Sequence, residues 1–238
     1  MFGWMRKMRA RAAAVTEGPA AAAPLLPAAE DATDPPITHD EPLQTPQLPA
    51  SLAERVTLLA DLGLHLSDSA DPSDIAQRID PNEADTPLAW LSVMGSLDPA
   101  GQTDGGSGHY SDDVWHFDSR AIRGHGSYRD IATQLQRLAR PLLDGHYFSD
   151  YVDLVGQAAR LTVVRGDDET RWDLGVQDEV ADLSVFQRMN EELAGAGTER
   201  RFALYPSTHR YLIVCKRPDQ ISAINERFGL LFTAPSAT

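Results

Sequence analysis

VWHFDSRAIRGHGSYRDIATQLQRLA, residues 114–139, is the stretch that decides the fold. Its first five residues predict a strand, in which side chains point alternately to opposite faces of a sheet. The aromatic pair Trp115 and Phe117 then shares the face toward the core, while His116 and Asp118 share the other face. A glycine-rich turn follows, and YRDIATQLQRLA repeats its apolar residues at helical spacing. The stretch therefore predicts the first strand and the first core helix of a domain.

The chain after this stretch alternates between strand and helix periods. Strands are predicted at AARLTVVR (158–165), ETRWDLGV (169–176), RFALYP (201–206), RYLIVCKR (210–217) and LLFTA (230–234), and helices at LSVFQRMNEELAG (183–195) and PDQISAINERFG (218–229). Residues 114–233 thus have the order β-α-β-β-α-β-β-α-β. Hairpins that alternate with helices predict an α+β domain, with a mixed, largely antiparallel sheet and helices on one face.

The chain before this stretch divides into three parts. Residues 51–97 hold three short helical segments, the first with Ser51 and Glu54 in a capping-box pattern, and predict a small helical subdomain that packs on the sheet. Residues 98–113 are rich in Gly, Ser and Asp and predict a flexible loop. Residues 1–50 predict a disordered leader, basic at first and then rich in Pro and Ala, and residues 234–238 a short tail.

The basic start, MFGWMRKMRARAAA, has three interpretations: a disordered leader, a weak membrane-surface anchor or an export signal. Its apolar run is too short to span a bilayer, so no transmembrane segment is predicted. The single cysteine, Cys215, cannot form an internal disulfide, and its apolar surroundings favour a buried strand residue. A chain without disulfides shows no adaptation to an oxidising compartment, and we expect a bacterial cytoplasmic protein.

Composition is that of an ordinary globular protein, but its charge is not balanced. The 238 residues carry a formal net charge of −14, and most of the excess lies beyond the leader. A negative charge of this size repels nucleic-acid phosphates and anionic membranes, and it favours a basic partner if it favours any. The alternative is that the acidity only keeps the protein in solution.

Two site hypotheses arise from the central stretch. His116, Asp118 and the nearby His125 could form a divalent-metal triad, although a hydrogen-bonded or solvated His/Asp pair is the favoured explanation. The turn before the helix could instead bind an anion or a phosphate group, since helix N-termini attract negative charge. The residues of this anion site would be Gly124, Gly126 and Ser127, with Arg120, Arg123 and Arg129 around them.

The same turn has simpler interpretations. Ser127 with Asp130 is an ordinary N-cap arrangement, in which the glycines only shape the entry into the helix. Ser127 with a histidine and Asp118 could also be written as a hydrolase triad, but Ser127 is not in a G-x-S-x-G elbow. No residue is therefore assigned a catalytic role, and no cofactor is expected.

The motif W-H-F-D-x-x-x-I-x-x-x-G-x-Y-x-x-I, Trp115 to Ile131, resembles a group of uncharacterised bacterial α+β proteins. The similarity extends over most of residues 51–233 and carries no known activity. Where the group is expected to have an acidic or cysteine-bearing segment after W-H-F-D, this chain has Ser119, Arg120 and Ala121. The resemblance therefore implies a fold and transfers no site residue.

Charge, size and motifs together predict a non-enzymatic binding module of a bacterial cytoplasm. Its partner would be a basic protein, and an immunity-like inhibitor of a basic toxin fits this description. The alternative is an anion- or nucleotide-binding enzyme or regulatory domain that uses the turn from Gly124 to Arg129.

Overall fold

The computed structural model describes residues 46–96, 108–207 and 209–235, and all of them belong to one compact unit, Leu43–Thr238. Its helices are α1 (Leu52–Asp61), α2 (Pro72–Arg78), α3 (Pro87–Met94), α4 (Ser127–Leu138), α5 (Ser184–Gly195) and α6 (Pro218–Phe228). Its strands are β1 (Val114–Asp118), β2 (His146–Asp153), β3 (Ala158–Arg165), β4 (Asp168–Gln177), β5 (Val180–Ala181), β6 (Arg201–Ser207) and β7 (Arg210–Lys216). Residues 1–45 of the predicted leader and residues 98–107 of the predicted loop lie outside the described residues. The last five residues of the predicted disordered leader, 46–50, are described and ordered: Leu48 is buried, and its N–H donates to the Asp85 carbonyl at 2.8 Å.

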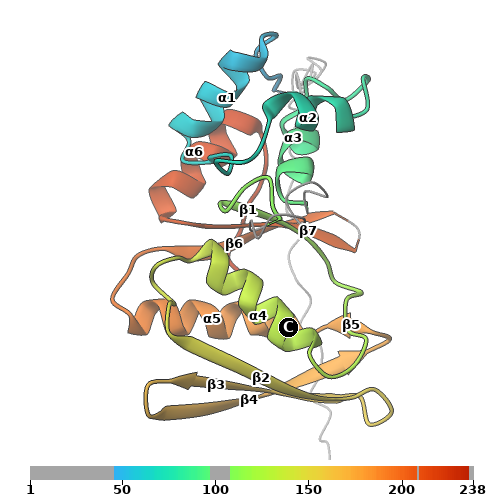
Figure 1. The fold of residues 1–238 in the computed structure, drawn as a ribbon, viewed down its shortest axis with the longest axis vertical. Coiled ribbons are helices and arrows are strands. Elements are labelled where there is room, and N and C mark those ends of the chain that lie inside the picture. Colours follow the sequence, from blue (N-terminus) through green and yellow to red (C-terminus); the bar gives the residue numbers. More distant parts are fainter. Residues whose placement is uncertain (1–45, 97–107, 208, 236–238) are drawn as a thin grey trace, which may run out of the picture. The chain divides into compact units, whose positions relative to one another are not determined.

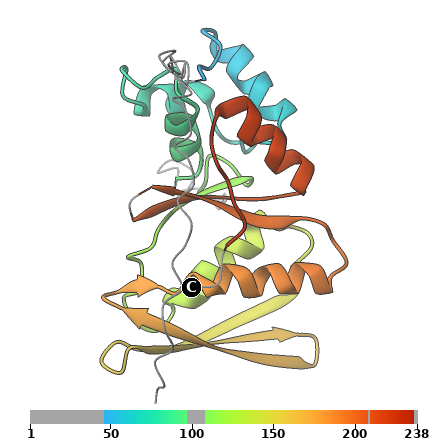
Figure 2. The same cartoon turned by 180° about the vertical axis from the view of Figure 1, so that it is seen from behind.

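The α+β class is confirmed, but the strands form two sheets where the sequence predicts one. One sheet has the order β1-β7-β6 and the other β2-β3-β4-β5, and every pairing among the described strands is antiparallel. Helices α1, α2, α3 and α6 lie on one side of the three-stranded sheet, and α4 and α5 lie between the two sheets (Figures 1 and 2). The three-stranded sheet is thus covered on both faces, and the four-stranded sheet on one.

The two faces of the three-stranded sheet belong to two separate hydrophobic cores. On β7, Leu212 and Val214 pack with the helices α1, α2, α3 and α6, while Ile213 and Cys215 pack with α4, α5 and the second sheet. Strand β1 divides in the same way, because Val114 joins the first core and Phe117 the second. This alternation confirms the predicted direction of the β1 side chains.

Several predicted helix ends are confirmed. Ser51 precedes α1 and its hydroxyl accepts a hydrogen bond from the Glu54 N–H, 3.2 Å away. Gly229 ends α6 with a φ of +61°, a left-handed conformation that glycine adopts without strain. Gly95, the C-cap of α3, is glycine for a different reason: a Cβ there would lie 2.5 Å from the backbone nitrogen of His116. Glycine therefore allows α3 to approach β1 closely.

Two strand predictions differ from the structure. Strand β2, HYFSDYVD, was not expected from the sequence, yet it pairs with β3 along its whole length. The predicted closing strand LLFTA forms only an isolated bridge between Thr233 and Leu204. In addition, residues 109–111, at the end of the predicted flexible loop, are buried, and the Tyr110 carbonyl accepts a hydrogen bond from the Ser67 N–H.

Candidate functional site

The N-terminus of α4, the predicted anion site, already holds a carboxylate of the chain itself. Asp150 on β2 accepts hydrogen bonds from the backbone N–H groups of Gly126 at 2.6 Å, Tyr128 at 2.8 Å and Arg129 at 3.3 Å. Gly124 and Gly126 have φ values of +144° and +95°, which favour glycine. The glycines thus shape the turn, and an external anion would have to displace Asp150.

The side chains around this turn are also engaged. Arg123 pairs with Glu179, Arg129 pairs with Asp130 at 2.8 Å, and Arg120 contacts the His209 ring at 2.6 Å. The Ser127 hydroxyl does not cap the helix but accepts a hydrogen bond from the Arg123 N–H, at 3.0 Å. The predicted N-cap function is therefore performed by Asp150 of β2, 24 residues after Gly126 in the chain.

The three residues of the metal hypothesis do not form a ligand set. The His125 Nδ1 atom accepts a hydrogen bond from the Val152 N–H at 2.9 Å, and its ring packs against the Tyr151 ring with 5.0 Å between centroids. His116 lies at the end of α3, where its backbone N–H donates to the Gly95 carbonyl at 2.7 Å, and Asp118 lies 3.9 Å from Arg210 at the outer end of the sheet. Among the described residues, no group of three His, Cys, Asp or Glu side chains is placed to bind a metal ion.

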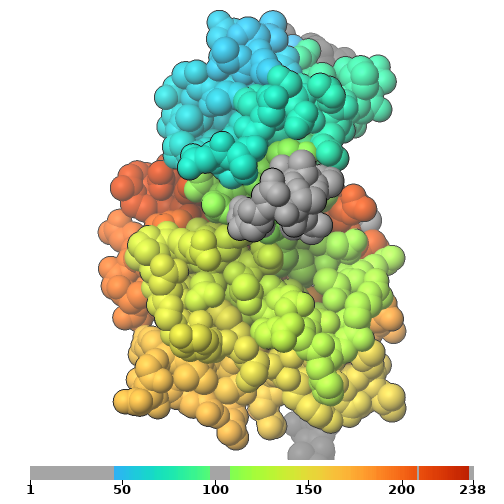
Figure 3. Space-filling model, in the orientation of Figure 1, coloured from blue at the N-terminus to red at the C-terminus, as the bar shows by residue number. Residues whose placement is uncertain are grey.

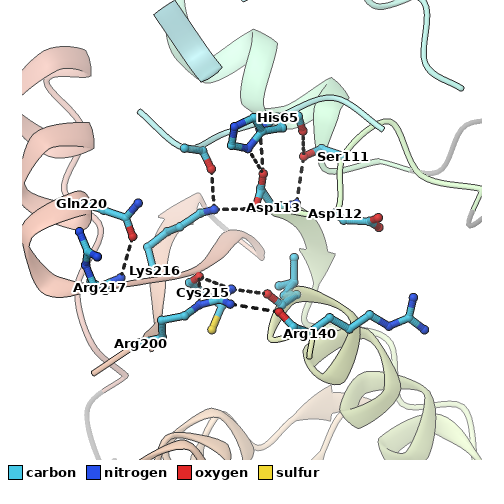
Figure 4. A network of polar contacts seen from close by, with 12 residues as sticks. His65, Ser111, Asp112, Asp113, Arg140, Arg200, Cys215, Lys216, Arg217 and Gln220 are labelled. Atoms are coloured by element: carbon cyan, nitrogen blue, oxygen red, sulfur yellow. Dashed lines mark hydrogen bonds and ion pairs between the residues drawn. The ribbon is translucent and has the colours of Figure 1, made fainter. Parts of the chain in front are cut away.

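A polar network that the sequence did not predict joins the first helices to the sheet (Figure 4). Lys216, at the end of β7, is buried, and its Nζ atom donates to the Asp113 carboxylate and to the Gly63 carbonyl, both at 2.5 Å. The other oxygen of Asp113 accepts from the His65 N–H at 2.8 Å and contacts His65 Nδ1 at 2.9 Å. Burial alone would raise the pKa of Asp113, but the Lys216 ammonium and these hydrogen bonds lower it overall.

Beside this network, Arg200 connects the end of α4 to β7. Its guanidinium donates to the carbonyls of Leu138, Arg140 and Cys215 at 2.9 to 3.2 Å. A cation at the C-terminal end of a helix is favourable, because the last carbonyls carry partial negative charge. Cys215 itself is buried as predicted, and burial raises the pKa of its thiol to about 11. The network therefore explains stability, and its cysteine stays protonated at neutral pH.

The acidic charge is concentrated in the helices that precede β1. Residues 46–96 contain eight acidic and two basic residues, whereas residues 108–217 contain 17 and 14. All eight carboxylates of residues 46–96 are exposed; they belong to Glu54, Asp61, Asp68, Asp71, Asp74, Asp80, Glu83 and Asp85. We call this surface, which covers α1–α3 and their connections (blue to teal in Figure 3), the acidic layer.

Few of these charges are neutralised within the chain. Arg55, one of the two basic residues, is buried and pairs with Asp85, which leaves Arg78 as the exposed base of the segment. The seven other carboxylates make no ion pair with any described residue. The total charge predicted an acidic protein, and a count by segment would also have located this surface.

Comparison with protein-family models, curated proteins and solved structures finds no match for this chain. The resemblance at Trp115 to Ile131 stays a prediction. Of the described helices, none has both the length and the apolar content needed to cross a bilayer.

Proposed function

We propose that this chain is a non-enzymatic binding module whose acidic layer binds a basic surface of another protein. The observation that carries the proposal is the set of seven exposed carboxylates without an ion-pair partner among the described residues, on a segment with one exposed base. Like charges on one surface repel one another, so a basic partner relieves this repulsion and is attracted from a distance. An immunity-like inhibitor of a basic toxin in a bacterial cytoplasm is the specific role that fits best.

The alternative, an anion- or nucleotide-binding domain at Gly124 to Arg129, has less support. Three backbone N–H groups that would bind the anion donate to Asp150 instead. A ligand phosphate would have to break these hydrogen bonds and bring its own charge close to the displaced carboxylate. The acidic layer requires no such rearrangement.

Two matched variants test the proposal on the full chain. The first neutralises four carboxylates of the acidic layer: Asp61→Asn, Asp68→Asn, Asp74→Asn and Glu83→Gln. The control makes the same change in net charge at exposed carboxylates outside the layer: Asp167→Asn, Asp178→Asn, Glu191→Gln and Glu199→Gln. The wild-type protein is used at low salt to capture partners from lysate of its own organism, and the Kd of each captured protein is then measured for all three chains.

We expect a basic partner whose binding weakens as salt is added. Exposed ion pairs contribute about 0.2–1 kcal/mol each, so the first variant should lose about 1–4 kcal/mol, or at least about fivefold in Kd. The control should bind nearly as tightly as the wild type. Equal losses in both variants would show that only total charge matters, and that outcome, or the capture of no basic protein, would refute the proposal.

A further inference from the structure

We propose that a cleft over the outer end of the three-stranded sheet binds a small organic carboxylate with an apolar body. The cleft lies between α3, the end of α6 and strands β1, β7 and β6, and has a volume of about 530 Å³. Small-molecule sites in proteins commonly measure about 300–1,000 Å³. This inference does not rest on the proposed function, although Asp80 and Glu83 of the acidic layer also line the cleft.

Strand register builds the floor of the cleft. His116 on β1 is paired with Leu212 on β7, which is paired in turn with Tyr205 on β6. Side chains at directly opposite positions lie about 5 Å apart on the same face of the sheet. This face is the one that the helices α1, α2, α3 and α6 cover further inward. His116 and Tyr205 therefore flank Leu212 where the helical cover ends.

The next set of paired residues on these strands, two positions nearer the outer end of the sheet, contains the charged side chains. It consists of Asp118, Arg210 and Ser207, in the same register on the same three strands. The Arg210 Nε atom lies 3.9 Å from the nearest Asp118 oxygen, and both side chains are more than half exposed. That separation is too long for a hydrogen bond, and no described residue hydrogen-bonds to the guanidinium, so that its donors can bind a ligand. Its planar fork matches a carboxylate in a bidentate arrangement.

His116 supplies a neutral polar group beside this cation. Burial and the Arg210 charge lower the pKa of His116. The imidazole is therefore neutral near pH 7. A neutral ring that donates through one nitrogen keeps the other as an acceptor for a ligand hydroxyl or N–H group. The floor thus offers one cation, one acceptor and the Tyr205 hydroxyl around an apolar centre.

The walls are apolar, and the roof is mixed. Leu88 and Val93 of α3, Phe228 of α6 and Leu230 contribute apolar side chains to the lining. The roof carries Arg78, which lies 5.6 Å above the Tyr110 ring, and two carboxylates. Asp80 is engaged by the Asn82 N–H at 2.9 Å, while Glu83 has no hydrogen bond or ion pair to its side chain among the described residues. Glu83 would favour a cationic ligand, which is the alternative that the experiment must distinguish.

Three probes of one shape separate these chemistries: benzoate, the neutral benzamide and the cationic benzylamine. Each is titrated into the ¹⁵N-labelled full chain at constant ionic strength. The highest concentration is 20 mM, roughly the largest Kd expected for specific binding of so small a molecule. We expect benzoate to shift the amide signals of Tyr205 and Leu212 and of the α3 residues, with benzamide weaker and benzylamine without effect.

The variant Arg210→Gln should weaken benzoate binding at least tenfold, while Arg171→Gln, an exposed arginine on the other sheet, should leave it unchanged. An unperturbed spectrum with benzoate would overturn the proposal. So would equal affinity of the wild type and Arg210→Gln, or preferential binding of benzylamine, which would assign the cleft to cations through Glu83.

Discussion

Replacing Asp150 tests how the central stretch is held. In Asp150→Ala, three N–H groups at the start of α4 lose their acceptor, and the helix loses a carboxylate at its positive end. Loss of an N-cap side chain costs about 0.5–2 kcal/mol, and charge-assisted hydrogen bonds contribute more than neutral ones. For a partly buried carboxylate with three donors, we expect a loss of about 2–3 kcal/mol. For a unit of this size, that corresponds to a fall in Tm of roughly 4–12 °C.

Urea unfolding followed by circular dichroism measures this change, and Asp150→Asn provides the graded control. Asparagine keeps one carbonyl oxygen at a similar position but not the charge, so about half of the loss should be recovered. A second result is specific to an emptied anion site: sulfate should stabilise Asp150→Ala more than it stabilises the wild type at matched ionic strength. A loss below about 0.5 kcal/mol for Asp150→Ala would refute the assignment of Asp150 as the cap of α4.

Two further substitutions test the packing between the first helices and the sheet. Gly95→Ala places a Cβ 2.5 Å from the His116 backbone nitrogen and should cost about 1–3 kcal/mol in thermal unfolding. The control is Gly195→Ala, whose Cβ would have no atom within 4 Å; it should be neutral or stabilise the protein by up to about 1 kcal/mol. Lys216→Met removes the partner of the buried Asp113 carboxylate and should cost about 2–3 kcal/mol at pH 7. The pKa of Asp113 is lower in the folded than in the unfolded chain, so the ionised carboxylate stabilises the fold at pH values above the pKa of an ordinary carboxyl group. This contribution to the free energy of unfolding is lost as the pH falls through the lowered, folded-state pKa. The difference in the free energy of unfolding between wild type and Lys216→Met should therefore become smaller toward pH 3. A difference that does not change with pH would contradict the ion pair.

Elements with strong local patterns were predictable from the sequence. Strand β4 alternates Trp172, Leu174 and Val176 toward the core, and each of these side chains is buried. Helix α5 places Val185, Phe186, Met189 and Leu193 on one face, and all four are buried as well. In both elements one face meets the core and the other meets solvent, so that burial repeats the sequence period.

Strand β2 was not predictable in this way, because its two faces do not differ in polarity as they usually do. Tyr147 and Tyr151 point outward and are 72% and 59% exposed, although tyrosine normally suggests the core side. On the inner face, Asp150 replaces an apolar residue because it caps α4. A polar residue inside and aromatic residues outside remove the period-two signal. The missed strand and the misassigned anion site therefore have one cause, since the residue that hides β2 is the residue that fills the site.

The presence of two sheets instead of the predicted one was also not predictable from the periodicity of the strands. Periodicity shows which residues of a strand share a face, but it does not show which strand will lie beside it. For β1 the shared face of His116 and Asp118 was predictable, and it suggested a metal site because both residues are possible ligands. The structure places β7 between β1 and β6, and the neighbours of these two side chains become Leu212 and Arg210.

An arginine beside a histidine opposes metal binding, because its charge repels the ion and lowers the pKa of the ring. The same pairing favours an organic anion, for which a fixed cation and a neutral acceptor are complementary. The chemistry of His116 thus depends on a residue 94 positions later, brought beside it by the antiparallel register of β1 and β7. The sequence contains both residues, but only the pairing of the strands decides that they act on the same ligand.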